Sequence, residues 1–184
     1  KNIIKPLDRA RYPELRYYNE SDENLLFLPW HFPLHEDMEL KGASEKAESL
    51  LKEDFPAIYQ HLLIHKEALL DRNQEETGKR YEWYALQRCA ASYYPEFEKN
   101  EKVIWGLTAN NWAFAYDDKQ HYLPSNGYIL TSTDIPIRYL LGWLNSKLMH
   151  HYFHYIGVMT AGGAYTLKAA TISALPFKIP EEYM

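Results

Sequence analysis

The feature that most constrains the fold is a change of hydrophobic period in the second half of the chain. Residues 102–130 alternate apolar and polar side chains, which is typical of β-strands. The apolar side chains that follow recur at helical spacing, and they are Ile137, Leu140, Leu141, Leu144 and Leu148. Asp134 as cap, Pro136 in the first turn and Gly157 at the end predict one helix over residues 134–156. Strands followed by a long helix predict an α+β protein.

Shorter patterns predict the remaining elements. Residues 1–42 combine short apolar runs with several prolines, which favours an irregular, β-rich opening segment. Helix formers begin at Ser44, and two more helices are predicted over residues 54–71 and 82–91. Loops or turns are predicted at residues 73–80, 117–120 (as a hairpin turn), 126–127 and 160–164, and a short helix at 168–173. The predicted fold is a mixed, largely antiparallel sheet with several packed helices in a single α+β domain over residues 1–184.

Length and composition narrow the class of protein. The 184 residues suit one domain, and 46% hydrophobic with 24% charged residues excludes disorder as the default. No apolar run approaches the roughly 18 residues that a membrane helix needs. A single cysteine, Cys89, rules out a disulfide framework, so we expect a reducing, cytoplasmic location. The chain opens at Lys1, and we expect it to be a piece of a longer protein.

The net charge of -5 is unevenly distributed along the chain. Residues 19–54 carry ten acidic and three basic side chains, so the rest of the chain sums to +2. Nucleic-acid binding needs only one local basic face, and the global sign therefore does not exclude it.

Enzyme signatures are missing from the sequence. There is no Gly-x-Ser-x-Gly turn, and Gly162 with Gly163 lacks the spacing of a phosphate-binding loop. The histidine pairs His61/His65 and His150/His154 have no carboxylate or thiolate at supporting spacing, so we expect no metal site and interpret these residues as core histidines. Cys89 has no CxxC partner and is interpreted as a small buried hydrophobe.

Three segments combine residue types that suit nucleic-acid binding. Residues 79–88 bring together basic, aromatic and glutamine side chains, in Lys79, Arg80, Trp83, Tyr84, Gln87 and Arg88. Residues 106–112 hold Asn110 and Asn111 between two predicted strands, and residues 163–168 place Tyr165 and Lys168 after a flexible loop. Each has a purely structural alternative: Trp83 with Leu86 as core, the asparagines as turn formers, and the glycine loop as a backbone contact point.

A series of short motifs resembles one known family. In chain order they are Trp83-Tyr84-x-Leu86, Lys102-Val103-Ile104-Trp105, Asn111-x-x-Phe114-Ala115-Tyr116-Asp117, Tyr122-Leu123, Tyr139-Leu140-Leu141-x-x-Leu144-Asn145-Ser146-Lys147-Leu148, Gly162-Gly163-x-Tyr165 and Leu175-Pro176. This order resembles the TaqI-like C-terminal specificity domain, which is the target-recognition part of adenine-specific DNA methyltransferases and fused restriction–modification enzymes, including type II restriction enzymes. Two departures thin the positive charge: residues 8–11 lack the family's glycine, and residues 166–170 are less basic than the family pattern.

The resemblance implies that this chain recognises duplex DNA and performs no chemistry itself. A methyltransferase needs a catalytic Asn/Asp-Pro-Pro-Tyr/Phe motif, and the chain has no Pro-Pro dipeptide. We therefore expect no cofactor in this chain, and expect S-adenosylmethionine to bind a catalytic methyltransferase domain of the same parent protein. No membrane partner is expected.

If the chain recognises DNA, the chemistry of its side chains and the predicted loops between strands lead to specific residue assignments. The expected phosphate-binding residues are Lys79, Arg80, Arg88 and Lys168, and the expected base-reading residues are Asn110, Asn111, Lys119 and His121. Residues expected either to contact DNA or to be structural are Trp83, Tyr84, Gln87 and Tyr165. Two alternatives stay open at this point: a carbohydrate- or peptide-binding module that stacks Trp112 or Tyr116 on a ligand, and a metal-dependent enzyme built on the histidine pairs.

Overall fold

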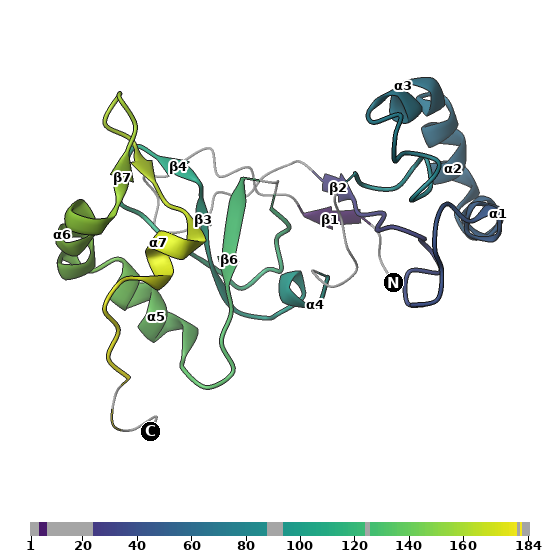
Figure 1. The fold of residues 1–184 in the computed structure, drawn as a ribbon. Helices are drawn as coiled ribbons and strands as arrows, with labels where there is room; N and C mark the ends of the chain where they lie inside the picture. Colours follow the sequence, from purple (N-terminus) through teal and green to yellow (C-terminus); the bar gives the residue numbers. More distant parts are fainter. Residues whose placement is uncertain (1–3, 7–23, 88–93, 124–125, 180, 182–184) are drawn as a thin grey trace. The chain divides into compact units, whose positions relative to one another are not determined.

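The computed structural model describes residues 4–6, 24–87, 94–123, 126–179 and 181, and it shows an α+β fold (Figure 1). The described residues form two compact units. The helical unit lies within Leu26–Tyr94, and the β-rich unit lies within Pro95–Met184. The predicted fold class is confirmed, because helices pack with small antiparallel sheets in this chain.

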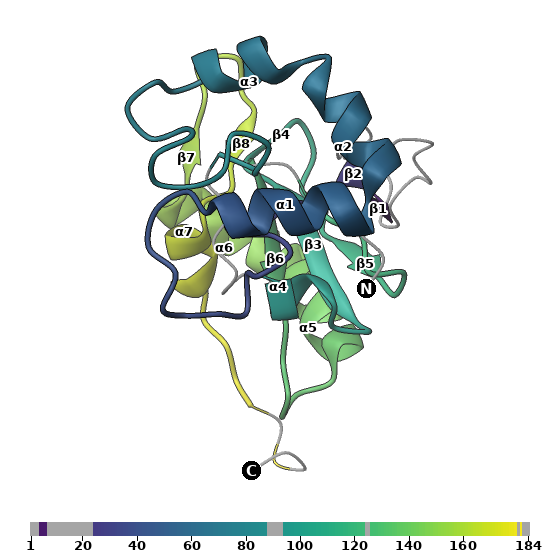
Figure 2. The ribbon, with the colours of Figure 1, turned by 90° about the vertical axis from the view of Figure 1, so that its right-hand side faces the viewer.

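The described residues of the helical unit include helices α1, α2 and α3, which are labelled in Figure 2. Helix α1 spans Glu45–Asp54, and the hydroxyl of its N-cap Ser44 accepts a hydrogen bond from the Ala47 N–H. Helix α2 spans Pro56–Leu63 and helix α3 spans Lys66–Asp71. The single helix expected over residues 54–71 is therefore interrupted at Ile64 and His65. The His65 N–H donates to the Leu62 carbonyl three residues back, and this tighter turn ends helix α2.

The helix expected over residues 82–91 is wrong for its described part, because residues 82–87 form turns and irregular backbone and none of them is helical. Trp83 and Tyr84 lie in the core of the helical unit instead of on one helical side. The indole N–H of Trp83 donates to Glu48, and the hydroxyl of Tyr84 donates to the Phe32 carbonyl. These long-range hydrogen bonds stabilise the turns of this segment, although the local spacing of its apolar residues favours a helix. The buried core of this unit comprises Leu28, Phe32, Leu51, Tyr59, Leu62, Trp83 and Tyr84.

The strands within the described residues are distributed over three small sheets. The first has the order β5-β3-β6, with β5 at Ala115–Asp117, β3 at Lys102–Gly106 and β6 at Gly127–Leu130, and both pairings are antiparallel. The second has the order β4-β8-β7, with β4 at Thr108–Ala109, β8 at Tyr165–Thr166 and β7 at Val158–Met159, again antiparallel. Strands β1 (Ile4–Pro6) and β2 (Asn24–Leu26) form a two-stranded sheet.

The turns are close to their expected positions, with one difference in pairing. Residues 117–120 form a turn after β5, but it is not a hairpin turn, because β5 and β6 both pair with β3 and not with each other. Asn126 precedes β6, and its carbonyl accepts a hydrogen bond from the Leu107 N–H. The loop at residues 160–164 joins β7 to β8 as expected.

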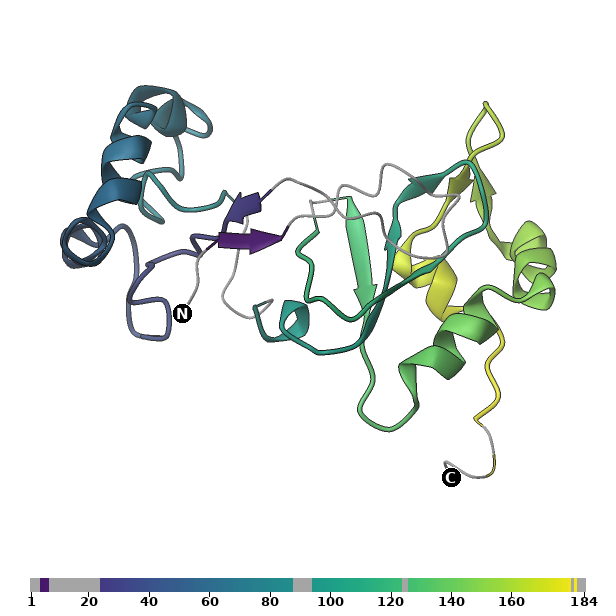
Figure 3. The same ribbon diagram turned by 180° about the vertical axis from the view of Figure 1, so that it is seen from behind.

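The helix expected over residues 134–156 is two helices that meet at a corner (Figure 3). Helix α5 spans Ile137–Leu144 and helix α6 spans Lys147–Ile156. Pro136 occupies the N-cap position of α5, and no side chain caps this helix by a hydrogen bond. The expected capping by Asp134 is therefore wrong. Gly157 ends α6 as expected, and its N–H donates to the Phe153 carbonyl. A Cβ at Gly157 would collide with the Phe153 ring, so a side chain there is sterically excluded.

The core of the β-rich unit lies where these helices meet the strands. Its buried residues are Val103, Trp105, Ala109, Phe114, Tyr116, Ile137, Leu140, Leu144, Met149, Phe153, Leu167, Ile172 and Leu175. Helices α4 (Tyr94–Phe97) and α7 (Ala169–Ser173) complete the elements, and α7 matches the short helix expected at 168–173. Among the described helices, none is both long and apolar enough to cross a membrane.

Candidate nucleic-acid interface

Pairing of β4 with β8 brings two of the three candidate segments together. Ala109 is opposite Tyr165, and the Leu167 N–H donates to the Leu107 carbonyl at 2.7 Å. Asn110 and Asn111 therefore follow β4 at the end of the sheet where the 160–164 loop enters β8. Both asparagines are exposed. Asn110 and Tyr165 are more than fifty residues apart in sequence, yet the pairing of β4 with β8 positions both.

Lys168 lies at the opposite end of the same strand pair. It directly follows Leu167, which bonds to Leu107, and it is the exposed N-cap residue of α7. The sheet thus presents two amide side chains beyond one end of β4 and an ammonium group near the other. Amides suit base edges and ammonium groups suit phosphates, so the two ends differ in what they can bind.

The loop connecting β7 and β8 is closed by its own hydrogen bonds. The Thr160 N–H donates to the Ala164 carbonyl at 2.7 Å, and the Ala164 N–H donates to the Thr160 hydroxyl at 3.1 Å. Gly163 has φ of 82°, a conformation that L side chains rarely adopt. The turn is therefore defined by local geometry beside the two asparagines.

His150 and Tyr165 join α6 to β8 beside this loop. The Nε2 atom of His150 lies 2.7 Å from the Tyr165 hydroxyl, and the His150 ring stacks on Trp112 with centroids 5.4 Å apart. Burial lowers the pKa of His150, and the neighbouring His154 and His151 lower it further. This environment is aromatic, and within the part of the chain that the structure describes no three histidine, cysteine or acidic side chains are grouped to hold a metal ion.

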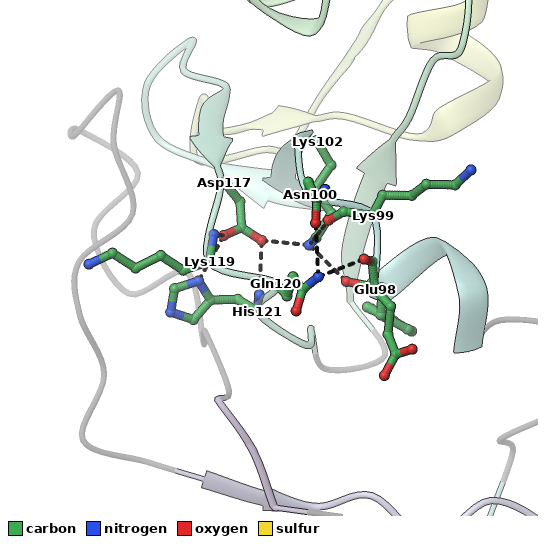
Figure 4. A network of polar contacts seen from close by, with 9 residues as sticks. Glu98, Lys99, Asn100, Lys102, Asp117, Lys119, Gln120 and His121 are labelled. Atoms are coloured by element: carbon green, nitrogen blue, oxygen red, sulfur yellow. Dashed lines mark hydrogen bonds and ion pairs between the residues drawn. The ribbon is translucent and has the colours of Figure 1, made fainter. Parts of the chain in front are cut away.

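The other two expected base-reading residues, Lys119 and His121, lie in the turn after β5 (Figure 4). Their turn is organised by Asp117, whose carboxylate accepts hydrogen bonds from the Lys119 N–H at 2.9 Å and the His121 N–H at 3.0 Å. The Nδ1 atom of His121 lies 2.9 Å from Asp117 Oδ1, and Lys102 Nζ lies 2.8 Å from Asp117 Oδ2. Burial alone would raise the pKa of Asp117, but the hydrogen bonds from His121, Lys102 and the Lys119 backbone outweigh it, and the pKa is lowered.

His121 is buried, which argues against its expected role as a base-reading residue. Lys119 is exposed, and its side chain points away from the buried carboxylate in Figure 4. Lys102 pairs with Asp117 at the start of β3, whereas Leu107 follows the end of β3. Five residues of strand span about 14 Å. The structure thus separates Lys119 and His121 from the two asparagines.

Two of the expected phosphate-binding residues, Lys79 and Arg80, belong to the helical unit and are exposed. Lys79 Nζ donates to the Gln74 carbonyl at 2.9 Å. The Arg80 guanidinium forms an ion pair with Glu76 at 2.9 Å and lies 4.9 Å above the Trp30 ring. The Arg80 guanidinium therefore contacts a carboxylate at one edge and an aromatic ring on one face.

The remaining expected residues of the 79–88 segment have different outcomes. The burial of Trp83 and Tyr84 favours the structural alternative for both aromatic residues. Gln87 is half-buried at the end of the turns, and Arg88 lies outside the described residues. The basic and aromatic side chains of residues 79–87 therefore do not lie together on a helix.

The β-rich unit contains a charge pattern that its overall balance conceals, because basic and acidic side chains are equal in number over residues 101–184. Residues 135–180 contain Arg138, Lys147, Lys168 and Lys178 but no aspartate or glutamate. This stretch runs through α5, α6, β7, β8 and α7. A shorter charge window would have found this acid-free stretch, which suits a polyanionic partner.

Comparison with known families identifies the class of the chain. Residues 60–177, more than half of the chain, match the model of the TaqI-like C-terminal specificity domain, and the chain belongs to this family. Domains of this family recognise DNA targets in restriction–modification systems and are not catalytic in themselves. The resemblance stated from the sequence is thereby confirmed. No curated protein matches the chain.

The structure also bears on the carbohydrate or peptide alternative. Trp112 is packed against Phe114, His150, Phe153 and Tyr165, and its indole N–H donates to the Leu144 carbonyl. Tyr116 is buried, its hydroxyl bonds to Glu101, and Arg138 lies over its ring. Both rings that would stack on such a ligand are already engaged within the protein.

Proposed function

We propose that this chain reads a short sequence in double-stranded DNA for an adenine methyltransferase domain in the same parent protein. The observation that carries the proposal is the β4–β8 pairing, which puts exposed Asn110 and Asn111 beyond one end of this strand pair and exposed Lys168 beyond the other. Membership of the specificity-domain family and the acid-free stretch at residues 135–180 support it.

Direct reading of bases is assigned to Asn110 and Asn111. An asparagine amide can donate to adenine N7 and accept from adenine N6 in the major groove, a pattern that no other base presents. Loops at the end of a sheet can enter a groove while the sheet keeps their geometry fixed. We leave His121 out of this set because it is buried, and Lys119 becomes a candidate contact elsewhere on the duplex.

Phosphate anchoring is assigned to Lys168, and on the helical unit to Lys79 and Arg80, with Arg88 kept as a candidate from the sequence. Such contacts position the protein on any duplex without reading its sequence. Both units would then act as one specificity domain over residues 1–184. Methyl transfer from S-adenosylmethionine would belong to the catalytic domain, in a cytoplasmic restriction–modification enzyme of type II character.

The test is a salt series of duplex binding, measured by fluorescence anisotropy of a labelled random-sequence DNA between about 50 and 200 mM salt. The proposal predicts that affinity falls steeply with salt, and that Lys168→Ala weakens binding to all sequences and reduces the salt slope by about one. Lys52→Ala is the matched control, because Lys52 is an exposed lysine in the acidic part of α1. Binding that does not change with salt would contradict the proposal and favour a neutral ligand.

A further inference from the structure

The two helices α5 and α6 are separated by Asn145, whose side chain bonds to a strand segment far away in sequence. The Asn145 Oδ1 atom accepts the Phe114 N–H at 3.0 Å, and the Asn145 Nδ2 group donates to the Phe114 carbonyl at 2.9 Å. The same Nδ2 group donates to the Leu141 carbonyl at 3.1 Å. One side-chain amide thus satisfies both backbone groups of Phe114 and one carbonyl near the end of α5.

A second hydrogen bond joins the same helix end to the same loop. The indole N–H of Trp112 donates to the Leu144 carbonyl at 2.7 Å. The last carbonyls of a helix have no intrahelical partner, so a helix that ends at Leu144 offers acceptors that a continuous helix would use internally. The break between α5 and α6 therefore creates the docking point for residues 112–114.

Asn110 and Asn111 lie in a loop, and these contacts fix the C-terminal end of that loop. Its N-terminal end is held by the pairing of Ala109 with Tyr165. Between the two fixed ends lie only residues 110–113, so the backbone of both asparagines has little freedom. Base reading through a bidentate amide depends on orientation, and a loop held at both ends is oriented before it meets DNA.

We propose that Asn145 is a positioning residue for sequence recognition: it fixes the loop of Asn110 and Asn111 without contacting DNA. This inference rests on the proposed function, since it needs the asparagines to read bases. In the free protein, without DNA, the loop should lose order when the Asn145 amide is removed. The order of the loop and the preference for one DNA sequence can be measured separately.

The first measurement is hydrogen exchange of the free protein with Asn145→Ala, compared with Ser146→Ala as the matched control. Ser146 is the next residue, and its hydroxyl caps α6 by accepting the Met149 N–H, so its loss weakens the corner without touching the loop. Exchange of the Phe114 amide should rise by about tenfold in Asn145→Ala and stay near the wild-type rate in Ser146→Ala. An unchanged rate in Asn145→Ala would overturn the proposal. Asn145→Ser serves as a milder variant if the alanine variant does not fold.

The second measurement uses a duplex that carries the motif enriched from a random duplex library by the wild-type chain. It is the ratio of the affinity for this selected duplex to the affinity for a scrambled duplex of equal length. Asn145→Ala should lower this ratio by about tenfold while leaving the affinity for scrambled DNA and its salt slope unchanged, and Ser146→Ala should keep the ratio. If exchange rises but the ratio is unchanged, the amide orders the loop without setting specificity, and the proposal is overturned while the proposed function stands. If wild-type protein shows no preference, the failure lies in the proposed function, and the role of Asn145 in recognition falls with it.

Discussion

Lys102 Nζ lies 2.8 Å from Asp117 Oδ2, and neither side chain is exposed to solvent. The ammonium group also donates to the Phe97 carbonyl at 2.9 Å, and the carboxylate accepts from the backbone of the 117–121 turn. A buried pair that is satisfied on every side organises its surroundings, because each partner alone would be an uncompensated charge. This pair ties the start of β3 to the turn that presents Lys119.

Removing one partner of this pair should destabilise the protein strongly. Lys102→Met leaves Asp117 buried without its cation, and we expect a loss of about 3–5 kcal/mol in the free energy of unfolding, measured by urea denaturation. The control is Arg80→Ala, which breaks an ion pair of nearly equal length at 2.9 Å, in which the arginine side chain is 62% exposed. That variant should lose less than about 1 kcal/mol. Equal losses in the two variants would show that burial is not the deciding factor.

The carboxyl group of Asp117 should stay ionised to lower pH than an ordinary aspartate. Hydrogen bonds from His121, Lys102 and the Lys119 backbone lower its pKa in the folded protein despite burial, whereas the unfolded chain titrates near 3.9. The unfolded state therefore binds more protons below about pH 4, and this contribution to stability is present above that pH and lost as pH falls through the folded pKa. The carboxyl-carbon chemical shift in an NMR titration measures the folded pKa, and a midpoint at or above 3.9 would contradict the account.

His150 should make the protein less stable in mild acid. Burial and the neighbouring His154 and His151 lower its pKa, so the folded protein resists protonation that the unfolded chain accepts near pH 6.5. The contribution of neutral His150 to the free energy of unfolding is therefore present above about pH 6.5 and declines as pH falls towards the pKa of His150 in the folded protein. Urea unfolding at pH 7.5 and 5.5 should show a smaller pH difference for His150→Gln than for wild type. An identical pH difference in the two proteins would remove His150 from this account.

Asn111 should act on sequence preference and not on general affinity. Asn111→Ala is expected to relax the preference at one base pair by about 1–3 kcal/mol, measured by competition with duplexes substituted at single positions. Lys168→Ala is the matched comparison, since a phosphate contact should weaken binding to every duplex alike. Equal losses on cognate and scrambled DNA for Asn111→Ala would refute its base-reading role.

Local patterns predict some elements of this fold well. Ser44 begins α1, Gly157 ends α6, and the alternating segment at residues 102–130 forms antiparallel strands. These features depend on side chains a few residues apart, and the sequence displays them directly. The family resemblance adds what no local pattern contains, namely the class of partner.

The errors have tertiary causes. Apolar side chains keep helical spacing from Leu144 to Leu148, so this spacing does not indicate the break at Asn145, whose side chain bonds to the distant Phe114 backbone. Trp83 likewise has helical spacing to Leu86, but the Trp83 indole bonds to Glu48 across the helical unit. Burial of the base-reading candidate His121 follows from the Asp117 network, which joins several separate parts of the chain.

The candidate site was predictable residue by residue but not as an arrangement. The chemistry of their side chains predicts Asn110, Asn111 and Lys168 individually, but their positions at the two ends of one strand pair depend on β4 pairing with β8 across more than fifty residues. Strand pairing at that separation leaves no local signal. The acid-free stretch at residues 135–180 was visible in the sequence, but only in a window matched to it.

Selection from a random duplex DNA library tests the central claim most directly, performed with the wild-type chain at about 50 mM salt and repeated at about 200 mM. The account predicts enrichment of one short motif, and loss of that enrichment in Asn111→Ala with general DNA retention preserved. Retention without enrichment would restrict the chain to phosphate anchoring and contradict base reading by Asn110 and Asn111. Absence of retention at both salt concentrations would contradict DNA recognition by this chain.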